Sequence, residues 1–383
     1  MGTVSPHAFL RTRPARGTCS FTRIEGAGIQ KSEGSVTVPF VDLGPSHAVV
    51  GDEIAADLAR LIERGVFVNG PDVEAFEQAF AAACGLEEGD EVIVPAMTFI
   101  ATFEAVVQAG GRPVVADVQD DDAGLDPAAA AAVVSPRTRF LLPVHLYGQM
   151  ADVRSLGELA DRTGIELLED ACQAHGAERD GVRAGGAGTA AAFSFYPSKN
   201  LGAMGDAGAL VLDDDDHLRK ARALREHGQT SRYRSEYVGY TARLDAFQAV
   251  VLLRKLPLLG RWNEERRAAA AFYREALWGV GDLKLPLAVH GAKHVWHVYA
   301  VRTADPAGLA AFLGARGIST SRHYPEPPHL AAAFSGLGRR AGAFPVAEAI
   351  ARETISLPMF PGITEEQLEA VAEAIRDFFA RGS

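Results

Sequence analysis

Cysteine is scarce in this chain of 383 residues, and its three copies are widely spaced. Cys19, Cys84 and Cys172 form no CxxC pair. Their odd number and wide spacing argue against a disulfide framework and against a cysteine-based zinc site. This cysteine usage favours a reducing compartment, so we expect a cytoplasmic protein that holds no metal.

Positive charge and long hydrophobic runs are also in short supply. Lysine and arginine number 38 against 49 acidic residues, which gives a formal net charge of -11. The resulting field repels phosphate backbones and anionic lipid surfaces, so nucleic acid and membranes are poor partners. No uninterrupted apolar stretch reaches the about 18 residues that a membrane-crossing helix needs. We therefore expect small-molecule substrates.

The rest of the composition is that of a globular protein, with 48% hydrophobic and 23% charged residues. Residues 1–37 differ, because they are rich in arginine, serine and threonine and contain no acid before Glu25. We predict that they form a disordered leader, with a targeting segment as the less favoured alternative. The remaining length suits a large domain at 38–260 and a small C-terminal domain at 261–383.

Short apolar runs alternate with segments of helical period from residue 38 onward, which is typical of an α/β fold with a mostly parallel sheet. The predicted strands are 91–95, 113–118, 140–144, 165–168, 191–195 and 209–212. Helices are expected at 52–64 and 240–259 and, in a smaller α+β domain, at 261–277, 305–316 and 365–379, together with a strand at 294–302. Ligands of such sheets bind at the carboxyl ends of the strands, so the residues there are the candidates for chemistry.

Two of these strand ends carry an acid and an amine. Asp170 follows one strand and Lys199 follows the next. Taken singly, such an Asp is more often a helix cap and such a Lys a solvated charge. Together they suit pyridoxal phosphate, which needs a lysine for a Schiff base and an acid beside its ring nitrogen. Ser194 could bind the phosphate, and Phe99 could stack on the ring, although Phe99 alone is more often a core residue.

Several longer strings resemble the DegT/DnrJ/EryC1/StrS family of sugar aminotransferases, which depend on pyridoxal phosphate. The matching strings are VPFVDL at 38–43, PVHLYGQMADV at 143–153, EDACQAHGA at 169–177, FSFYPSKNLGAMGDAGALV at 193–211, RLDAFQA at 243–249 and SLPMFPGITEEQ at 356–367. The resemblance runs from about residue 38 to 379 and implies the fold type I transferase architecture, as in aspartate aminotransferase. It also implies a homodimer with active sites near the subunit interface.

The resemblance also assigns roles to individual residues. Lys199 matches the Schiff-base lysine, and Asp170 matches the partner of the pyridine nitrogen. Gln173 matches the side chain near the phenolic oxygen, while Ser194 and Phe99 match the phosphate ligand and the stacking aromatic. His323 and Tyr324 lie where family members often meet substrate, with turn and core packing as an equally weighted alternative.

Two departures from the family pattern concern the cofactor phosphate. Family members carry a strand and a Gly-Ser/Thr-rich turn that opens a helix before the strand at 91–95, and that helix start holds the phosphate. Only 86–90 stand in its place here, too few for a β-α unit, so we expect this cradle to be deleted. Thr241 replaces an Asn that reaches the phosphate of the neighbouring subunit, and its hydroxyl has a shorter reach.

Two weaker signals invite other interpretations. The string GVRAGGAG at 181–188 resembles a dinucleotide loop, but it precedes a strand, whereas a Rossmann fingerprint follows one. His294 and His297 could suggest a metal pair, yet an offset of three on a strand places two side chains on opposite faces.

The sequence as a whole favours a pyridoxal-phosphate-dependent aminotransferase. We expect it to transfer an amino group from glutamate to a keto group of a nucleotide-linked sugar. A ketocyclitol or another amine-forming reaction of secondary metabolism is the alternative within this class. A catalytically silent paralogue that binds the cofactor weakly or not at all is the alternative outside it.

Overall fold

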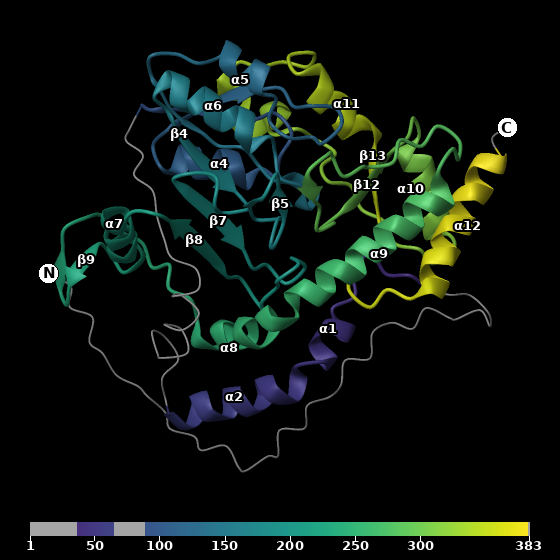
Figure 1. The fold of residues 1–383 in the computed structure, drawn as a ribbon, viewed down its shortest axis with the longest axis horizontal. Helices are drawn as coiled ribbons and strands as arrows, with labels where there is room; N and C mark the ends of the chain where they lie inside the picture. The colour runs from purple at the N-terminus through teal and green to yellow at the C-terminus, as the bar shows by residue number, and fades with distance from the viewer. Residues whose placement is uncertain (1–36, 65–88, 382–383) are drawn as a thin grey trace, which may run out of the picture. The chain divides into compact units, whose positions relative to one another are not determined.

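A computed structural model describes residues 37–64 and 89–381 of the chain (Figure 1). The predicted leader at 1–37 lies outside the described residues except for Thr37. So does most of the shortened stretch at 85–90, and the deletion of a β-α unit there stays a prediction.

A six-stranded sheet forms the centre of the described chain, in the order β2-β1-β3-β4-β7-β8. Its strands are β1 (Glu91–Pro95), β2 (Arg112–Ala116), β3 (Thr138–Leu141), β4 (Glu166–Asp170), β7 (Ala190–Ser194) and β8 (Gly208–Leu212). All neighbours are parallel except β7 and β8. The six strands predicted from the sequence are confirmed, with ends shifted by a few residues, and so is the mostly parallel α/β architecture.

Helices cover both faces of this sheet because its strands are apolar on both sides. Val92 and Val94 of β1 belong to the core beneath α4 (Ala101–Gln108) and α11 (Pro345–Glu353), whereas Ile93 packs with α5 (Pro127–Ala132) and α6 (Val153–Thr163). The strand order changes direction at β1: β2 lies on one side of β1, and β3 and the later strands lie on the other side. Such a switch point opens a crevice at the carboxyl ends of the strands, where ligands bind.

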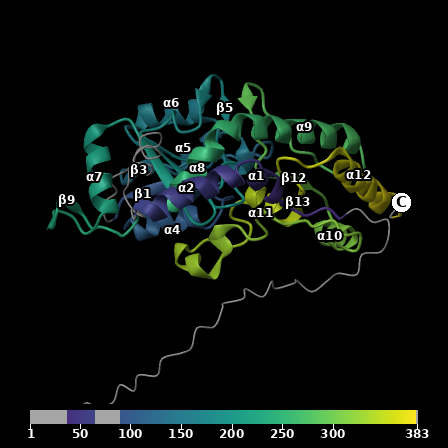
Figure 2. The same ribbon diagram turned by 90° about the horizontal axis from the view of Figure 1, so that it is seen from below.

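Helix α2 (Gly51–Arg64) confirms the predicted helix at 52–64. It lies beside α8 (Ala246–Lys255), as both views show (Figure 1 and Figure 2). Ile54 of α2 packs with Val251 of α8, and the Arg254 guanidinium binds the Asp57 carboxylate with two N–H groups. An apolar contact and an ion pair thus join α2 to α8.

The predicted helix at 240–259 is wrong at both ends. Residues before Ala246 are extended, and Thr241 forms a bridge with Glu226. At the other end, Pro257 lacks an N–H group, and the chain tightens into a 3₁₀ turn at Leu256–Leu258. The chain then continues as α9 (Leu259–Leu277), so Gly260 lies in the first turn of a helix and does not end one.

The C-terminal part contains the antiparallel strands β12 (Tyr299–Arg302) and β13 (Thr354–Leu357). Helices α9, α10 (Pro306–Gly314) and α12 (Glu365–Arg381) share a core with them. The predicted strand at 294–302 is wrong before residue 299, because Trp296 has φ +47°, which an extended strand does not allow. The predicted boundary at 260 stays a prediction, and α9 runs across it.

The remaining elements are short. They are α1 (Gly44–Ala48), α7 (Asp215–Arg225), β5 (Glu178–Arg179), β6 (Val182–Arg183), β9 (Gln229–Ser231), β10 (Arg234–Ser235), β11 (Ala292–Lys293) and 3₁₀ turns at Leu146–Gly148, Pro328–Leu330 and Ala332–Leu337. Within 37–64 and 89–381, no helix combines the length and apolar character needed to cross a membrane.

Candidate active site

Asp170 is the last residue of β4, and its backbone is fixed by the neighbouring chain. Its N–H donates to the Pro143 carbonyl at 2.9 Å, and its carbonyl accepts the His145 N–H at 2.9 Å. The carboxylate is also engaged, because Oδ2 accepts the Thr102 hydroxyl at 2.8 Å and Oδ1 accepts the Cys172 N–H at 3.2 Å. The acid is therefore held in one orientation at the carboxyl edge of the sheet.

Lys199 lies in the loop after β7, where its N–H donates to the Tyr196 carbonyl at 2.8 Å. Burial lowers the pKa of its amine, and the nearby Cys172 and Asp170 oppose this shift only in part. A lowered pKa increases the neutral fraction of a lysine, and the neutral amine is the form that attacks a carbonyl carbon. The structure thus brings the predicted amine and acid together in a setting that favours nucleophilic chemistry.

Neutral imidazoles surround this amine. Burial, followed by the charge of Lys199, lowers the pKa of His175 to about 3 and that of His323 to about 4. The same two causes bring the pKa of His297 well below its ordinary value. No second cation therefore competes with Lys199 from these three positions near pH 7.

Gln173 links the sheet edge to the C-terminal part of the chain. Its Oε1 accepts the Tyr147 N–H at 2.7 Å, and its Nε2 donates to the Tyr324 hydroxyl at 3.0 Å. The Tyr324 ring lies 5.3 Å from that of Phe99, centroid to centroid. Phe99 is 51% exposed, so it is not a core residue. An exposed aromatic ring thus stands beside the predicted cofactor groups, where it could stack on a planar ligand.

The remaining predicted residues have hydrogen-bond partners other than Asp170 and Lys199. Ser194 ends β7, and its Oγ accepts the Tyr196 N–H at 3.3 Å. His323 places Nδ1 2.8 Å from the Ser356 hydroxyl. Thr241 is exposed on the arm at 226–241, where its hydroxyl lies 3.4 Å from both ring nitrogens of His227. The described contacts of Thr241 include neither Asp170 nor Lys199.

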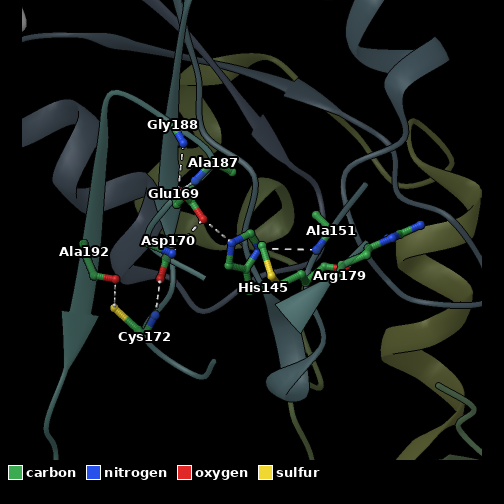
Figure 3. A network of polar contacts seen from close by, with 11 residues as sticks. His145, Ala151, Glu169, Asp170, Cys172, Arg179, Ala187, Gly188 and Ala192 are labelled. Carbon is green, nitrogen blue, oxygen red and sulfur yellow. Dashed lines mark hydrogen bonds and ion pairs between the residues drawn. The ribbon is translucent and has the colours of Figure 1, made fainter. Parts of the chain in front are cut away.

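A buried polar network behind Asp170 was not anticipated from the sequence (Figure 3). The Glu169 carboxylate accepts a hydrogen bond from His145 Nε2 at 2.8 Å. It also accepts hydrogen bonds from the N–H groups of Gly185, Ala187 and Gly188 at 2.8 to 2.9 Å. The Ala151 N–H donates to His145 Nδ1 at 3.3 Å, so Nε2 carries the proton. The string at 181–188 therefore supplies backbone donors to an internal carboxylate. Two of its glycines have local reasons, because Gly185 has φ +89° and a Cβ at Gly188 would lie 2.3 Å from the Leu167 carbonyl oxygen.

The two histidines considered as metal ligands face other groups. His294 stacks on Trp296 at a centroid distance of 3.7 Å, and His297 places Nδ1 3.2 Å from Asn200 Oδ1. In the part of the chain that the structure describes, no three His, Cys, Asp or Glu side chains gather as a metal site.

The residues present fit pyridoxal phosphate. The described residues bring together a partly buried amine, a carboxylate held by two donors, an exposed aromatic ring and a side-chain amide. Lys199 and Asp170 would hold the carbonyl carbon and the ring nitrogen, Phe99 the ring face, Gln173 the phenolic oxygen and Ser194 the phosphate.

Comparisons with known proteins agree with this fit. Residues 81–376 match the model of the DegT/DnrJ/EryC1/StrS aminotransferase family. The chain is 41% identical over 366 residues to the dTDP-3-amino-3,4,6-trideoxy-alpha-D-glucose transaminase of Streptomyces venezuelae, with 90% of this chain and 97% of the relative covered. It is 40% identical over 368 residues to the pleiotropic regulatory protein of Geobacillus stearothermophilus, with 90% and 99% covered.

A solved structure shows the same fold. The crystal structure of S. venezuelae DesV in complex with a ketimine intermediate superposes with a TM-score of 0.86 at 40% identity, covering 89% of this chain and 98% of that one. The fold is therefore that of the pyridoxal-phosphate-dependent transferases. Together with the matched family model, it shows that this chain belongs to the DegT/DnrJ/EryC1/StrS aminotransferase family.

Proposed function

We propose that this protein transfers an amino group from glutamate to a keto group of a nucleotide-linked sugar. The observation that carries the proposal is the placement of two groups: the Asp170 carboxylate ends β4, and the Lys199 amine lies in the loop after the adjacent strand β7, close enough for the Asp170 charge to oppose the lowering of its pKa. The transaminase of S. venezuelae, which acts on a dTDP-linked sugar by its name, supports this substrate class.

Each site residue has a defined task in this reaction. The bound cofactor supplies an electron sink for the carbon that loses its proton. Lys199 would hold the cofactor and, once displaced by the amino donor, would take the donor's α-proton as general base and deliver a proton to the cofactor's carbonyl carbon. In the second half the amine would move a proton in the opposite direction, from that carbon to the former keto carbon of the acceptor. Asp170 keeps a proton on the ring nitrogen. His323 and Tyr324 lie beside the site from the C-terminal part and would contact the substrate.

The working unit is a homodimer in the cytoplasm in this proposal. The arm at 226–241 supports the dimer, because it exposes large apolar side chains such as Tyr233 at 85% and Val238 at 97%. Clustered exposed apolar surface of this kind marks interaction sites. Thr241 lies on the same arm, where it could reach the cofactor phosphate of the neighbouring subunit. The scattered cysteines support a reducing cytoplasm.

The decisive experiment is a titration of the purified protein with pyridoxal phosphate, with Lys199→Ala as the matched control. We expect a saturable visible absorption band that is lost in the variant, followed by amino transfer from glutamate to keto-sugar nucleotides. Activity with ketocyclitols but not with keto-sugar nucleotides would show that the acceptor is a ketocyclitol and not a nucleotide-linked sugar. A folded protein without a band would refute the enzyme and favour the silent paralogue, a possibility that the regulatory name of one relative keeps relevant.

A second ligand tests the predicted loss of the phosphate cradle. Pyridoxal forms the same lysine adduct as pyridoxal phosphate but lacks the phosphate. If Ser194 supplies the main phosphate contact, pyridoxal phosphate should bind only about tenfold to a hundredfold more tightly than pyridoxal, the value of one charge-assisted hydrogen bond. A much larger ratio would show that the phosphate is held by donors beyond Ser194 and would contradict the predicted loss of phosphate contacts.

A further inference from the structure

A chain of two hydroxyl groups ends on the Asp170 carboxylate, and the catalytic roles above do not use it. Thr102 Oγ1 donates to Asp170 Oδ2 at 2.8 Å, and Thr98 Oγ1 lies 2.8 Å from Thr102 Oγ1. A hydroxyl has a single proton to donate. Because Thr102 gives its proton to Asp170, Thr98 must donate to Thr102, and all donors in the chain point toward the carboxylate.

Both hydroxyls are shielded from water, since Thr98 is 1% and Thr102 is 4% exposed. Hydrogen bonds to a charged group in such surroundings are stronger than neutral ones, and successive bonds polarise one another. The chain therefore holds the Asp170 carboxylate in one orientation. Water cannot readily replace either donor if it is removed.

We propose that Thr102, supported by Thr98, is a positioning residue that holds the Asp170 carboxylate aimed at the cofactor's ring nitrogen. This inference rests on the proposed function. A carboxylate aimed at the ring nitrogen would accept its N–H, and a proton on that nitrogen makes the ring an electron sink. Without the Thr102 donor the carboxylate can turn away from the ring nitrogen, and that hydrogen bond weakens.

The position of the two threonines links this function to ring stacking. Phe99 lies between Thr98 and Thr102 in the segment that leads from β1 into α4. The same short segment therefore orients the aromatic ring and the acid, two groups that contact different parts of one cofactor. Their relative position is set locally, before any ligand arrives.

The first test uses the apo protein and a double-mutant cycle of Thr102→Val and Asp170→Asn, read by the equilibrium constant of unfolding. We expect the two positions to be coupled by about tenfold, the value of one hydrogen bond to a charged group. Thr102→Ser keeps the hydroxyl and should retain most of this coupling. Additive effects would overturn the proposal.

The second test uses the holoprotein with pyridoxal phosphate labelled with ¹⁵N in the ring. In Thr102→Val the ring nitrogen signal should move toward the unprotonated value, and Thr102→Ser should restore it, with Thr98→Val between the two. A stable Thr102→Val holoprotein with an unchanged nitrogen signal would refute the positioning role of Thr102. A wild-type protein without a Lys199-dependent band would refute the proposed function. It would also refute the positioning role, whatever coupling the double-mutant cycle shows between Thr102 and Asp170.

Discussion

Glu169 is the group whose replacement tests the internal frame of the site most sharply. Its carboxylate is 1% exposed and accepts four hydrogen bonds. In Glu169→Gln, an NH₂ group replaces one oxygen while the size of the side chain is unchanged. Whichever oxygen is replaced, two donors that faced it now face another donor.

The magnitude follows from this geometry. Oε1 serves Ala187 and Gly188, and Oε2 serves His145 and Gly185, so the amide loses two bonds in either orientation. A change of tautomer at His145 offers no escape, because its Nδ1 already accepts the Ala151 N–H. Two charge-assisted bonds amount to about 3 to 6 kcal/mol of unfolding free energy. We expect a melting temperature lower by at least several degrees and a weaker cofactor band.

The assay is thermal and denaturant unfolding of the apo protein, with Glu178→Gln as the matched control. Glu178 loses a partly exposed contact at 4.0 Å with Arg183, which should cost less than about 0.5 kcal/mol. A Glu169→Gln protein within about 1 kcal/mol of wild type would refute the reasoning, since a change of that size is typical of an average substitution.

The pH dependence of stability gives an independent check on Glu169. Burial alone would raise the pKa of its carboxyl, but the bonds from His145 and the loop N–H groups together hold it below the ordinary value of 4.5. A carboxyl with a lowered pKa stabilises the fold above about pH 4.5 and loses this contribution as the pH falls through its lower folded value. The acid-dependent part of the unfolding free energy should therefore be smaller in Glu169→Gln.

Two further predictions address the site and the arm. Burial and Lys199 lower the pKa of His323 to about 4, so its ring signals in NMR should not titrate above about pH 5. The free energy of unfolding should decrease as the pH falls from 6.5 toward 4, because the unfolded chain binds a proton there that the folded His323 does not. A midpoint near 6.5 in the NMR titration would contradict this. In Gly228→Ala, at φ +71°, the new Cβ would lie 1.9 Å from the Tyr237 carbonyl oxygen, so the arm must move and sedimentation should show monomers. Gly260→Ala, which meets no atom within 4 Å, should stay dimeric, and a dimeric Gly228→Ala would argue against the arm as the interface.

The sheet was predictable because its signals are local. Each strand is a short apolar run between turn formers, and its partners follow from the parallel α/β pattern. The helix at 240–259 is wrong at both ends and the strand at 294–302 is wrong at its start, and two of these three errors arose where a local pattern continues through a change of backbone direction. Pro257 interrupts a run of helical period, and Trp296 turns the chain within a run of strand-like residues.

The site was predictable only in part, for a related reason. Lys199, Asp170 and Gln173 follow strands and carry chemistry that one cofactor requires, so position and residue type both point to them. Thr102 gives no such signal, because its importance comes from a contact with a residue 68 positions away. His145 and Glu169 likewise meet through tertiary structure, because the chain after β3 runs parallel to β4 at the Val144–Asp170 bridge.

The structure also bears on whether the predicted loss of the phosphate cradle would silence the site. The contacts that position Asp170 and Gln173 come from Thr102, Pro143 and Tyr147, which lie after the shortened stretch at 85–90. The groups that act on the cofactor ring are thus fixed by segments other than the shortened stretch, and so is Ser194, the phosphate ligand proposed on β7. Shortening the stretch at 85–90 would reduce the affinity for the cofactor, whereas proton transfer depends on the groups that act on the cofactor ring. An intact Lys199, Asp170 and Gln173 set is therefore better explained by an enzyme with weakened cofactor binding than by a paralogue that has lost its chemistry.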